Sequence, residues 1–283
     1  MEGDVKYISQ CNMLRSVIGK DDSMMKVSII TTCYNRASTI SDAIRSVYAQ
    51  DYPDIEYIIV DGASKDGSQA VIESVLKDVP ENVQVKYISE PDKGMYEAIN
   101  KGIRMATGEV IGLCHSDDLL YSTDTISHIV VRLQETNADF LYADGVFVNA
   151  EKLDKVVRRW IGGKYSRWKV RHGWLPLHPT CYIKRSVMER LGLYDEQYKI
   201  AADTDLLVRY LSRTDLKVAY LREFVIRMRM GGMSTDSAKR KKMWQEDIHV
   251  YQAHNFKHVT LTKIEKIMWK LPQFVFAKLK GEH

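Results

Sequence analysis

The polar group that points most directly to chemistry is the tetrad His115-Ser116-Asp117-Asp118. It follows the apolar run Glu109–Cys114, which predicts a buried strand that ends where the two carboxylates begin. Adjacent carboxylates repel each other and lose hydration at a strand end, so they favour a site where a cation neutralises them. Carboxylate oxygens suit Mg²⁺ or Mn²⁺, and such ions commonly arrive with the phosphates of a substrate. Taken alone, the same residues also fit a polar turn that caps a helix.

Three earlier segments repeat this arrangement of an apolar run that ends in polar residues. The runs are Lys26–Cys33, Ile55–Val60 and Gln84–Ile88, and each is followed by a helical pattern. Strands that alternate with helices predict a parallel sheet wound with right-handed crossovers. The polar ends of the strands should therefore gather along one edge. The carboxylates expected there are Asp61, Asp66, Glu90, Asp92, Asp117 and Asp118.

An amphipathic helix is predicted between the first two of these strands. Apolar residues recur there at helical spacing, from Ile40 to Tyr48. Thr39 and Asp42 stand three residues apart at its start, as the two partners of a capping box do.

Composition is typical of a folded, intracellular protein. The chain has 283 residues, of which 45% are hydrophobic, enough for one large core or two smaller ones. No apolar run is long enough to cross a bilayer, and residues 1–25 lack the apolar core of a signal peptide. The cysteines have no metal or redox spacing, so we expect reduced, mostly buried thiols in the cytoplasm. They are Cys11, Cys33, Cys114 and Cys181.

Positive charge is concentrated at the C-terminal end of the chain. The segment Lys239–His283 holds ten Lys or Arg and four Asp or Glu, a net charge of +6, whereas the whole chain carries +4, so the rest carries −2. Its basic residues alternate with aromatic ones, which favours a face that lies on an anionic membrane. A terminal helix pair docked on the domain is the alternative, and both remain open.

A second basic stretch, Lys152–Arg171, also contains Trp160 and Trp168 and could hold an anionic substrate. No nucleic-acid-binding motif is present and the chain is only mildly basic, so no nucleic acid partner is expected.

Five motifs resemble, in order, the landmarks of family 2 bacterial glycosyltransferases with the GT-A fold, in particular those of colanic-acid-type surface polysaccharide pathways. The resemblance covers about residues 26–235. The motifs are VSIITTCYNR (27–36), VDGASKDGS (60–68), SEPDKGMYEAINKG (89–102), SDD (116–118) and AADTDL (201–206).

The resemblance implies an α/β nucleotide-diphospho-sugar transferase fold with a mostly parallel twisted sheet, flanking helices and a C-terminal helical extension. Residues 1–25 would be an N-terminal extension, 26–120 the nucleotide-sugar-binding half, 121–235 the acceptor-binding half, and 236–283 a basic amphipathic helical tail.

It also implies roles for individual residues of the donor site. Thr32, Tyr34 and Asn35 would line the nucleotide pocket, and Asp61 would contact the base. One departure concerns the second strand: the family commonly has Asp-Asp-Gly-Ser where this chain has Asp-Gly-Ala-Ser (61–64), so the second carboxylate is missing.

Three further residues complete that site in the family pattern. Lys93 would meet phosphate or sugar, Asp117 the ribose, and Asp118 the Mn²⁺ or Mg²⁺ ion that bridges the diphosphate. The metal would act as a Lewis acid on the leaving diphosphate.

The reaction implied is hexosyl transfer with inversion, which needs a general base from another part of the chain. Asp203 matches the family's catalytic position, and Asp205 is the second candidate. By residue type alone, Asp203 fits a helix cap equally well. His178 is a candidate acceptor or phosphate contact, although a lone histidine is more often a structural hydrogen-bond partner.

The predicted function is transfer from a nucleotide diphosphate sugar, expected to be a UDP-sugar, to a saccharide acceptor in bacterial surface polysaccharide biosynthesis. The acceptor is expected to be linked to polyprenyl diphosphate, and the enzyme to lie peripherally on the inner face of the plasma membrane. A catalytically silent nucleotide-sugar or membrane-binding module is the alternative. A dinucleotide-dependent oxidoreductase fits less well, because no Gly-x-Gly-x-x-Gly follows the first strand.

Overall fold

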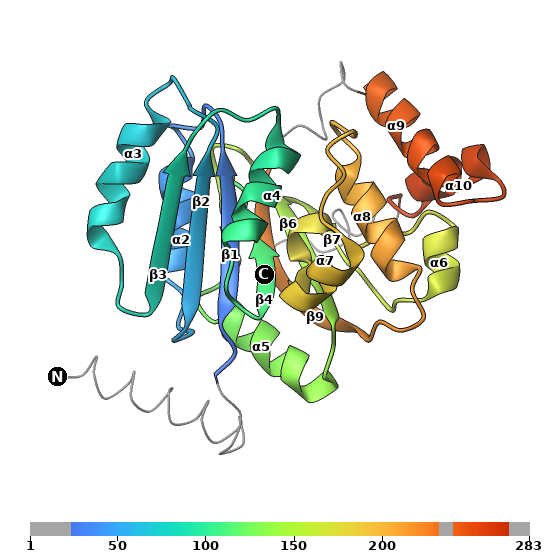
Figure 1. Cartoon of the computed structure of the whole chain (residues 1–283), viewed down its shortest axis with the longest axis horizontal. Coiled ribbons are helices and arrows are strands. Elements are labelled where there is room, and N and C mark those ends of the chain that lie inside the picture. The colour runs from blue at the N-terminus through green and yellow to red at the C-terminus, as the bar shows by residue number, and fades with distance from the viewer. Residues whose placement is uncertain (1–23, 232–239, 272–283) are drawn as a thin grey trace.

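The structure is a computed structural model that describes residues 24–231 and 240–271 (Figure 1). The predicted N-terminal extension therefore lies almost wholly outside the described residues. The strands are β1 (Val27–Cys33), β2 (Ile55–Asp61), β3 (Val83–Ser89), β4 (Val110–Leu113), β5 (Asp118–Leu120), β6 (Phe140–Val148), β7 (Val156–Trp160), β8 (Tyr182–Lys184) and β9 (Val218–Arg229). The helices are α2 (Ile40–Tyr48), α3 (Ser68–Val75), α4 (Met95–Met105), α5 (Thr125–Thr136), α6 (Arg167–Arg171), α7 (Arg185–Leu191), α8 (Ala202–Leu211), α9 (Arg240–Ala253) and α10 (Val259–Met268).

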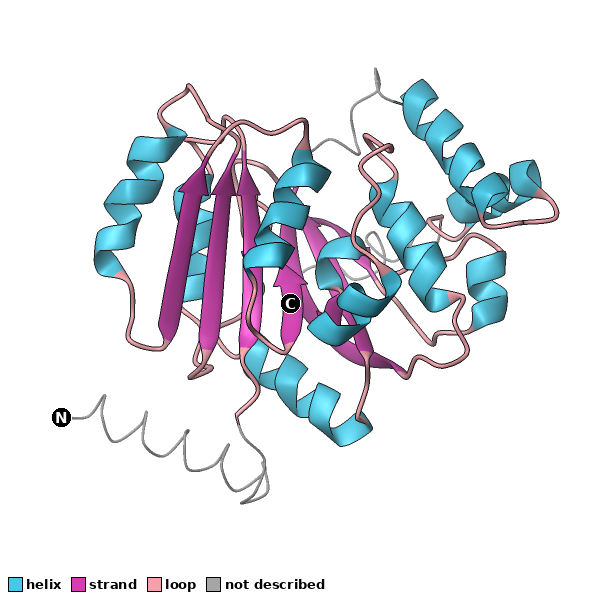
Figure 2. Ribbon diagram, viewed as in Figure 1, coloured by secondary structure: helices cyan, strands magenta, loops and turns pink. Residues whose placement is uncertain are grey.

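The described strands form one sheet in the order β3-β2-β1-β4-β8-β6-β9-β5, with β7 paired to β6 (Figure 2). The first four strands in this order are parallel, as the alternation of strands and helices predicts. Beyond β4 the sheet is mixed: β8 is antiparallel to both of its neighbours, whereas β6 and β9 are parallel. The chain thus builds a parallel half first and joins it to a mixed half through β8.

Helices cover both faces of the sheet, and a separate apolar core lies between the sheet and the helices on each face. Successive residues of a strand point to opposite faces, so Ile29 packs in the core under α2, α3 and α5, whereas Ile30 packs in the core under α4 and α8. The strand β1 is buried along its whole length for this reason. The runs that became β1 and β2 are therefore strands covered on both faces, whereas the edge strand β3 is largely half-buried.

The α2 helix spans Ile40–Tyr48 as predicted, but the predicted capping box at its start is wrong. Thr39 occupies the N-cap position without a side-chain hydrogen bond to the helix, and its hydroxyl has no partner. Asp42 turns away from the N-cap and pairs with Arg229 on β9. A charged tertiary partner thus replaces the local bond that the spacing suggests.

The helices α9 and α10 are docked on the domain, as one of the two interpretations of the basic tail predicts. Val250, Tyr251 and Phe256 join the same core as α4 and α8. On α9, Asp247 is 1% exposed and pairs with Lys263 and Lys266 of α10. Figure 1 shows the pair beside α8 and α6. Neither α9, α10 nor any other helix of residues 24–231 and 240–271 has the length and apolarity to cross a membrane.

Candidate active site

The parallel half contains a point where the strand order reverses. From β1 the chain moves to β2 and β3 on one side, while β4 lies on the other side of β1. In open α/β sheets the loops that leave such a point diverge and open a crevice at the carboxyl ends of the strands. The loops that leave this point carry Tyr34 and Asn35 after β1, and Asp117 and Asp118 after β4. The topology therefore brings together two of the sequence motifs.

A set of hydrogen bonds locks the loop after β1 to the loop after β2. The Asn35 backbone N–H donates to Ser64 Oγ over 2.8 Å, and the Lys65 N–H donates to Asn35 Oδ1 over 2.9 Å. Asn35 and Ala63 both have positive φ angles, 53° and 58°. Left-handed backbone at two non-glycine residues costs free energy, and such conformations cluster where a loop must hold a defined shape for function.

Asp61 ends β2 and is fully buried. Its Oδ1 accepts from Ser64 Oγ, and its Oδ2 accepts from the Ser64 N–H over 3.0 Å and from Ser89 Oγ over 2.6 Å. The carboxylate thus joins β2, its following loop and the end of β3. Tyr34 lies nearby with 58% of its surface exposed, while Thr32 is buried at the end of β1.

Asp118 is the first residue of β5, next to β9, and is 3% exposed. Its Oδ2 has no hydrogen-bond partner. Burial and the neighbouring Asp117 raise the pKa of this carboxyl well above its usual range. A buried carboxylate oxygen without a partner is costly, so this position suits a cation.

The general-base candidate Asp203 lies in the first turn of α8, in the other half of the protein. Its Oδ1 accepts from the Thr204 N–H over 2.7 Å and lies 3.3 Å from the Tyr96 hydroxyl. Burial raises the pKa of Asp203, against the opposing effect of Lys266 and the Thr204 N–H. A carboxylate of raised pKa is a better proton acceptor near neutral pH. The helix begins at Ala202, so Asp203 is not its N-cap residue.

Asp205 faces a different set of neighbours. Its Oδ2 pairs with Arg209 Nη2 at 3.1 Å, and its Oδ1 lies 2.8 Å from His254 Nε2. Both oxygens are therefore engaged, Oδ2 within α8 and Oδ1 with the segment after α9. These contacts indicate that Asp205 stabilises the packing of α8.

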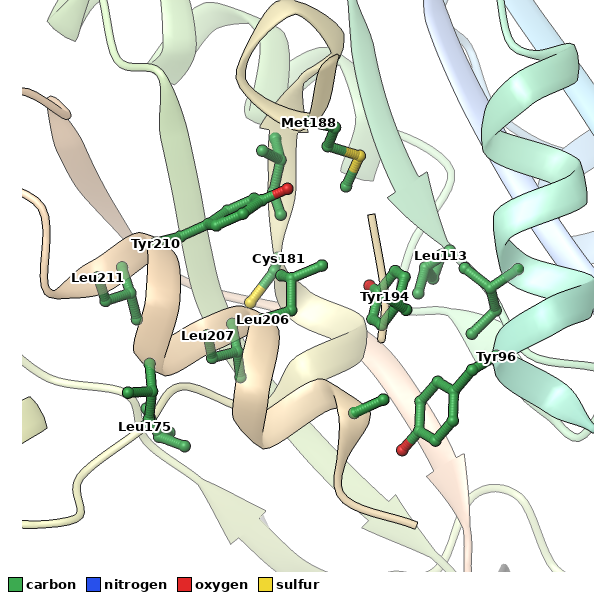
Figure 3. Packing of buried hydrophobic residues seen from close by; sticks show 14 of the residues in the cluster. Tyr96, Leu113, Leu175, Cys181, Met188, Tyr194, Leu206, Leu207, Tyr210 and Leu211 are labelled. Atoms are coloured by element: carbon green, nitrogen blue, oxygen red, sulfur yellow. The ribbon is translucent and has the colours of Figure 1, made fainter. Parts of the chain in front are cut away.

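Two residues of α4 join the halves, and sequence reasoning missed both. The Tyr96 hydroxyl lies 2.7 Å from Ile200 O and 3.3 Å from Asp203 Oδ1, and its single proton can be donated to either acceptor. One turn further on, the Asn100 side chain exchanges two hydrogen bonds with the backbone of Tyr194. Figure 3 shows Tyr96 and Tyr194 between α4 and α8, and their rings stack with centroids 5.7 Å apart. Polar residues four apart on an otherwise buried helical face were the available signal.

His178 lies in the same region. Its Nε2 is 2.7 Å from the Tyr194 hydroxyl, and its ring centroid is 6.2 Å from that of His115. Burial, with a smaller contribution from His115, lowers the pKa of His178 to about 3. The imidazole is therefore neutral at physiological pH and acts on Tyr194 as a hydrogen-bond partner.

The family model described as "Glycosyl transferase family 2" matches residues 28–192, more than half of the chain. The chain belongs to glycosyl transferase family 2. Among curated relatives, the glycosyltransferase is similar to the PGL/p-HBAD biosynthesis glycosyltransferase of Mycobacterium bovis, with 26% identity over 73% of this chain and 78% of the relative. A glycosyltransferase of Mycobacterium tuberculosis is 29% identical over 65% of this chain and 68% of the relative.

Solved structures establish the fold of the glycosyltransferase as GT-A. Staphylococcus aureus TarS 1–349 in complex with UDP-GlcNAc has a TM-score of 0.64 and 18% identity, covering 89% of this chain and 79% of that one. The mannosyltransferase PcManGT from Pyrobaculum calidifontis, in complex with GDP-Man and Mn²⁺, has a TM-score of 0.62 and 17% identity, covering 98% and 84%. The chain spans 43% of the longer TarS structure.

The family 2 match includes the donor-side residues from Thr32 to Asp118 but ends before Asp203. Among the described residues of this glycosyltransferase, no three His, Cys, Asp or Glu side chains converge on one metal position. Mg²⁺ and Mn²⁺ in nucleotide sites commonly use one or two carboxylates and complete their shell with phosphate and water. The unpartnered oxygen of Asp118 beside Asp117 fits that kind of site.

Proposed function

We propose that this protein is an inverting, metal-dependent glycosyltransferase that moves a hexose from a UDP-sugar to a hydroxyl of a saccharide acceptor. The observation that carries the proposal is the placement of two distinct carboxylate sites. Asp117 and Asp118 follow β4, with Asp118 at the start of β5 beside β9, and Asp203 lies on α8, to which Tyr96 of α4 reaches across. Inversion needs charge neutralisation on one side of the sugar and a base on the other.

The donor nucleotide is proposed to occupy the crevice between the loops after β1 and β4. Thr32, Tyr34 and Asn35 would line the nucleotide, with the exposed ring of Tyr34 available to stack on the base. Lys93, exposed at the start of α4, would meet the diphosphate or sugar. Support comes from the hydrogen bonds that lock the loop after β1 to the loop after β2, since a rigid pocket loses less entropy on binding.

Two further donor contacts complete the proposed pocket. Asp61 would hold the base side of the pocket, and Asp117 the ribose. Asp118 would hold Mn²⁺ or Mg²⁺, which as a Lewis acid stabilises the departing diphosphate. Support comes from the buried, unpartnered Asp118 oxygen.

In the proposed step the acceptor hydroxyl oxygen forms a bond to the anomeric carbon while the bond from that carbon to the diphosphate oxygen breaks. Asp203 accepts the hydroxyl proton, and the nucleoside diphosphate leaves with the bonding electron pair. The raised pKa of Asp203 and its position on α8, a different element from the one that carries Asp118, support this role. Asp205 is the weaker candidate because Arg209 and His254 engage its oxygens.

The acceptor is proposed to be a lipid-linked saccharide of bacterial surface polysaccharide synthesis, met at the cytoplasmic face of an anionic membrane. Apolar side chains on α10 and in the turn directly after it support this. Leu261, Ile264, Met268 and Leu271 recur at helical spacing and are 45–58% exposed. The net positive charge of Lys239–His283 is complementary to anionic lipid.

A screen of nucleotide sugars tests the central proposal. Purified protein is incubated with UDP-, GDP-, CDP- and dTDP-sugars with and without Mn²⁺, and thermal shift and released nucleoside diphosphate are measured. We expect a metal-dependent thermal shift and slow hydrolytic release for UDP-sugars. The absence of any metal-dependent response to any nucleotide sugar would contradict the proposed function.

A further inference from the structure

The loop between β3 and α4 places a carboxylate next to the residue that directly follows β2. Gly62 stands where related sequences commonly carry a second Asp. A Cβ atom at position 62 would lie 2.4 Å from Asp92 Oδ2 and 3.3 Å from Tyr34 Cδ2. Asp92 thus occupies the space of any side chain at position 62, and a carboxylate at that position would exclude it.

A hydrogen bond to the backbone holds Asp92 in this position. Its Oδ1 accepts from the Gly94 N–H over 2.9 Å. Gly94 precedes α4, so the backbone that holds Asp92 is continuous with the helix that carries Tyr96. The other oxygen, Oδ2, is the one that approaches Gly62 and Tyr34.

The carboxylate of Asp61, in contrast to that of Asp92, already uses most of its capacity to accept hydrogen bonds. It is fully buried and already accepts three hydrogen bonds from Ser64 and Ser89. Asp92 is half-buried, and burial raises the pKa of its carboxyl, as expected for a charge that lacks sufficient donors. A hydrogen-bond donor from a ligand would supply what Asp92 Oδ2 lacks.

We propose that Asp92 is the residue that selects the base of the nucleotide donor, through an Oδ2 that accepts a ring N–H from a uracil stacked on Tyr34. The inference rests on the proposed function, because it assumes a nucleotide in this crevice. Asp61 then acts as a positioning residue that fixes the loops around the base.

The selectivity follows from donor and acceptor patterns. A carboxylate only accepts hydrogen bonds. Uracil presents an N–H at ring position 3, whereas cytosine presents a lone pair there, which a carboxylate repels. A site built to pair one pattern discriminates strongly against the other, because the mismatched polar groups stay unpaired.

Asp92→Asn tests the inference, because it replaces the hydrogen-bond acceptor Oδ2 with an amide group that donates hydrogen bonds. The amide oxygen can keep the bond from the Gly94 N–H, and the amide NH₂ then takes the place of Oδ2. We expect the ratio of the CDP to the UDP dissociation constant, measured by isothermal titration with Mn²⁺, to fall roughly tenfold or more. A purely structural role for Asp92 would weaken both nucleotides alike.

Asp78→Asn makes the same chemical change at an exposed site before β3, at the opposite end of the strand, and should leave the ratio unchanged. Gly62→Ala is the second variant, because its methyl group would displace Asp92 Oδ2 while leaving every carboxylate in the chain. It should also lower the preference for UDP.

An unchanged ratio in folded Asp92→Asn protein would overturn the inference, and if that variant does not fold, an unchanged ratio in Gly62→Ala would do so. Failure of the wild-type protein to bind either nucleotide would instead overturn the proposed function, and this inference with it.

Discussion

The Tyr96 hydroxyl lies 3.3 Å from Asp203 Oδ1 and so joins the helix that follows the donor loop to the carboxylate proposed as the base. The same hydroxyl lies 2.7 Å from Ile200 O, one residue before the α8 N-cap. A hydrogen bond to a carboxylate favours its ionised form. The single proton of the Tyr96 hydroxyl is shared between these two acceptors, so Tyr96 helps to position Asp203 and to stabilise its ionised form.

Tyr96→Phe should move the acid limb of the pH–kcat profile to higher pH. Loss of a donor raises the pKa of Asp203, and only the deprotonated base accepts a proton, so activity is lost at a higher pH than in the wild type. We expect kcat near that limb to fall about tenfold. Tyr52→Phe removes a hydroxyl bonded to Met25 O and is the matched control. Superimposable profiles would refute this coupling.

Asp203→Asn and Asp205→Asn should have opposite consequences. Asp203→Asn removes proton acceptance and should lower kcat by about two orders of magnitude with little change in donor affinity. Asp205→Asn breaks a buried ion pair and should cost about 3 kcal/mol in the free energy of unfolding, with the smaller effect on kcat. Steady-state kinetics and thermal melts separate the two, and the reverse pattern would exchange the two roles.

Asp118→Asn should abolish turnover without unfolding the protein. A neutral amide is less costly to bury than an unpartnered carboxylate, so the melting temperature without metal should stay equal or rise. Binding of nucleoside diphosphate should lose its dependence on Mn²⁺. Titrations with and without the ion provide the measurement, and unchanged Mn²⁺-dependent binding would remove Asp118 from the metal site.

The docking of α9 and α10 should weaken in acid. Burial alone would raise the pKa of Asp247, but Lys266 and Lys263 outweigh it and lower the pKa to about 2. An unfolded Asp titrates near 3.9, so the contribution is complete above about pH 4 and is lost as the pH falls through about 2. It amounts to about 2 to 3 kcal/mol.

Urea unfolding as a function of pH measures this effect. Asp247→Asn should be less stable at pH 7 and should lose less stability between pH 4 and 2. Asp154→Asn, which makes the same change at an exposed site, is the control. Parallel curves for Asp247→Asn and wild type would show that Asp247 is not the group responsible.

Membrane binding should depend on the apolar side of α10. Ile264 and Met268 are 45% and 58% exposed, so changing both to Gln should weaken binding to phosphatidylglycerol vesicles about tenfold at low salt without lowering the melting temperature. Val79→Gln is a control at an exposed apolar site elsewhere. A wild-type protein that sediments equally with anionic and neutral vesicles would rule out this membrane proposal.

The sequence determined the order of elements in the parallel half. Buried strands that lack solvent on either face read as continuous apolar runs, and their polar ends mark the edge where loops meet. The runs ending at Cys33, Val60 and Ile88 became β1, β2 and β3 with boundaries within one residue at those ends. Ordered motifs then identified the family, because their succession along the chain is itself sequence information.

Tertiary structure alone decided which carboxylates face the site. Asp203 and Asp205 are two residues apart, and on a helix that spacing turns them to different sides, so only the packing of α8 shows that Asp205 meets His254 and Asp203 meets Tyr96. Asp42 likewise does not take part in the predicted cap of α2 but pairs with Arg229, 187 residues away. The contact of Asp92 with Gly62 was hidden for the same reason: it joins two loops whose separation is set by the sheet, and no local pattern records it.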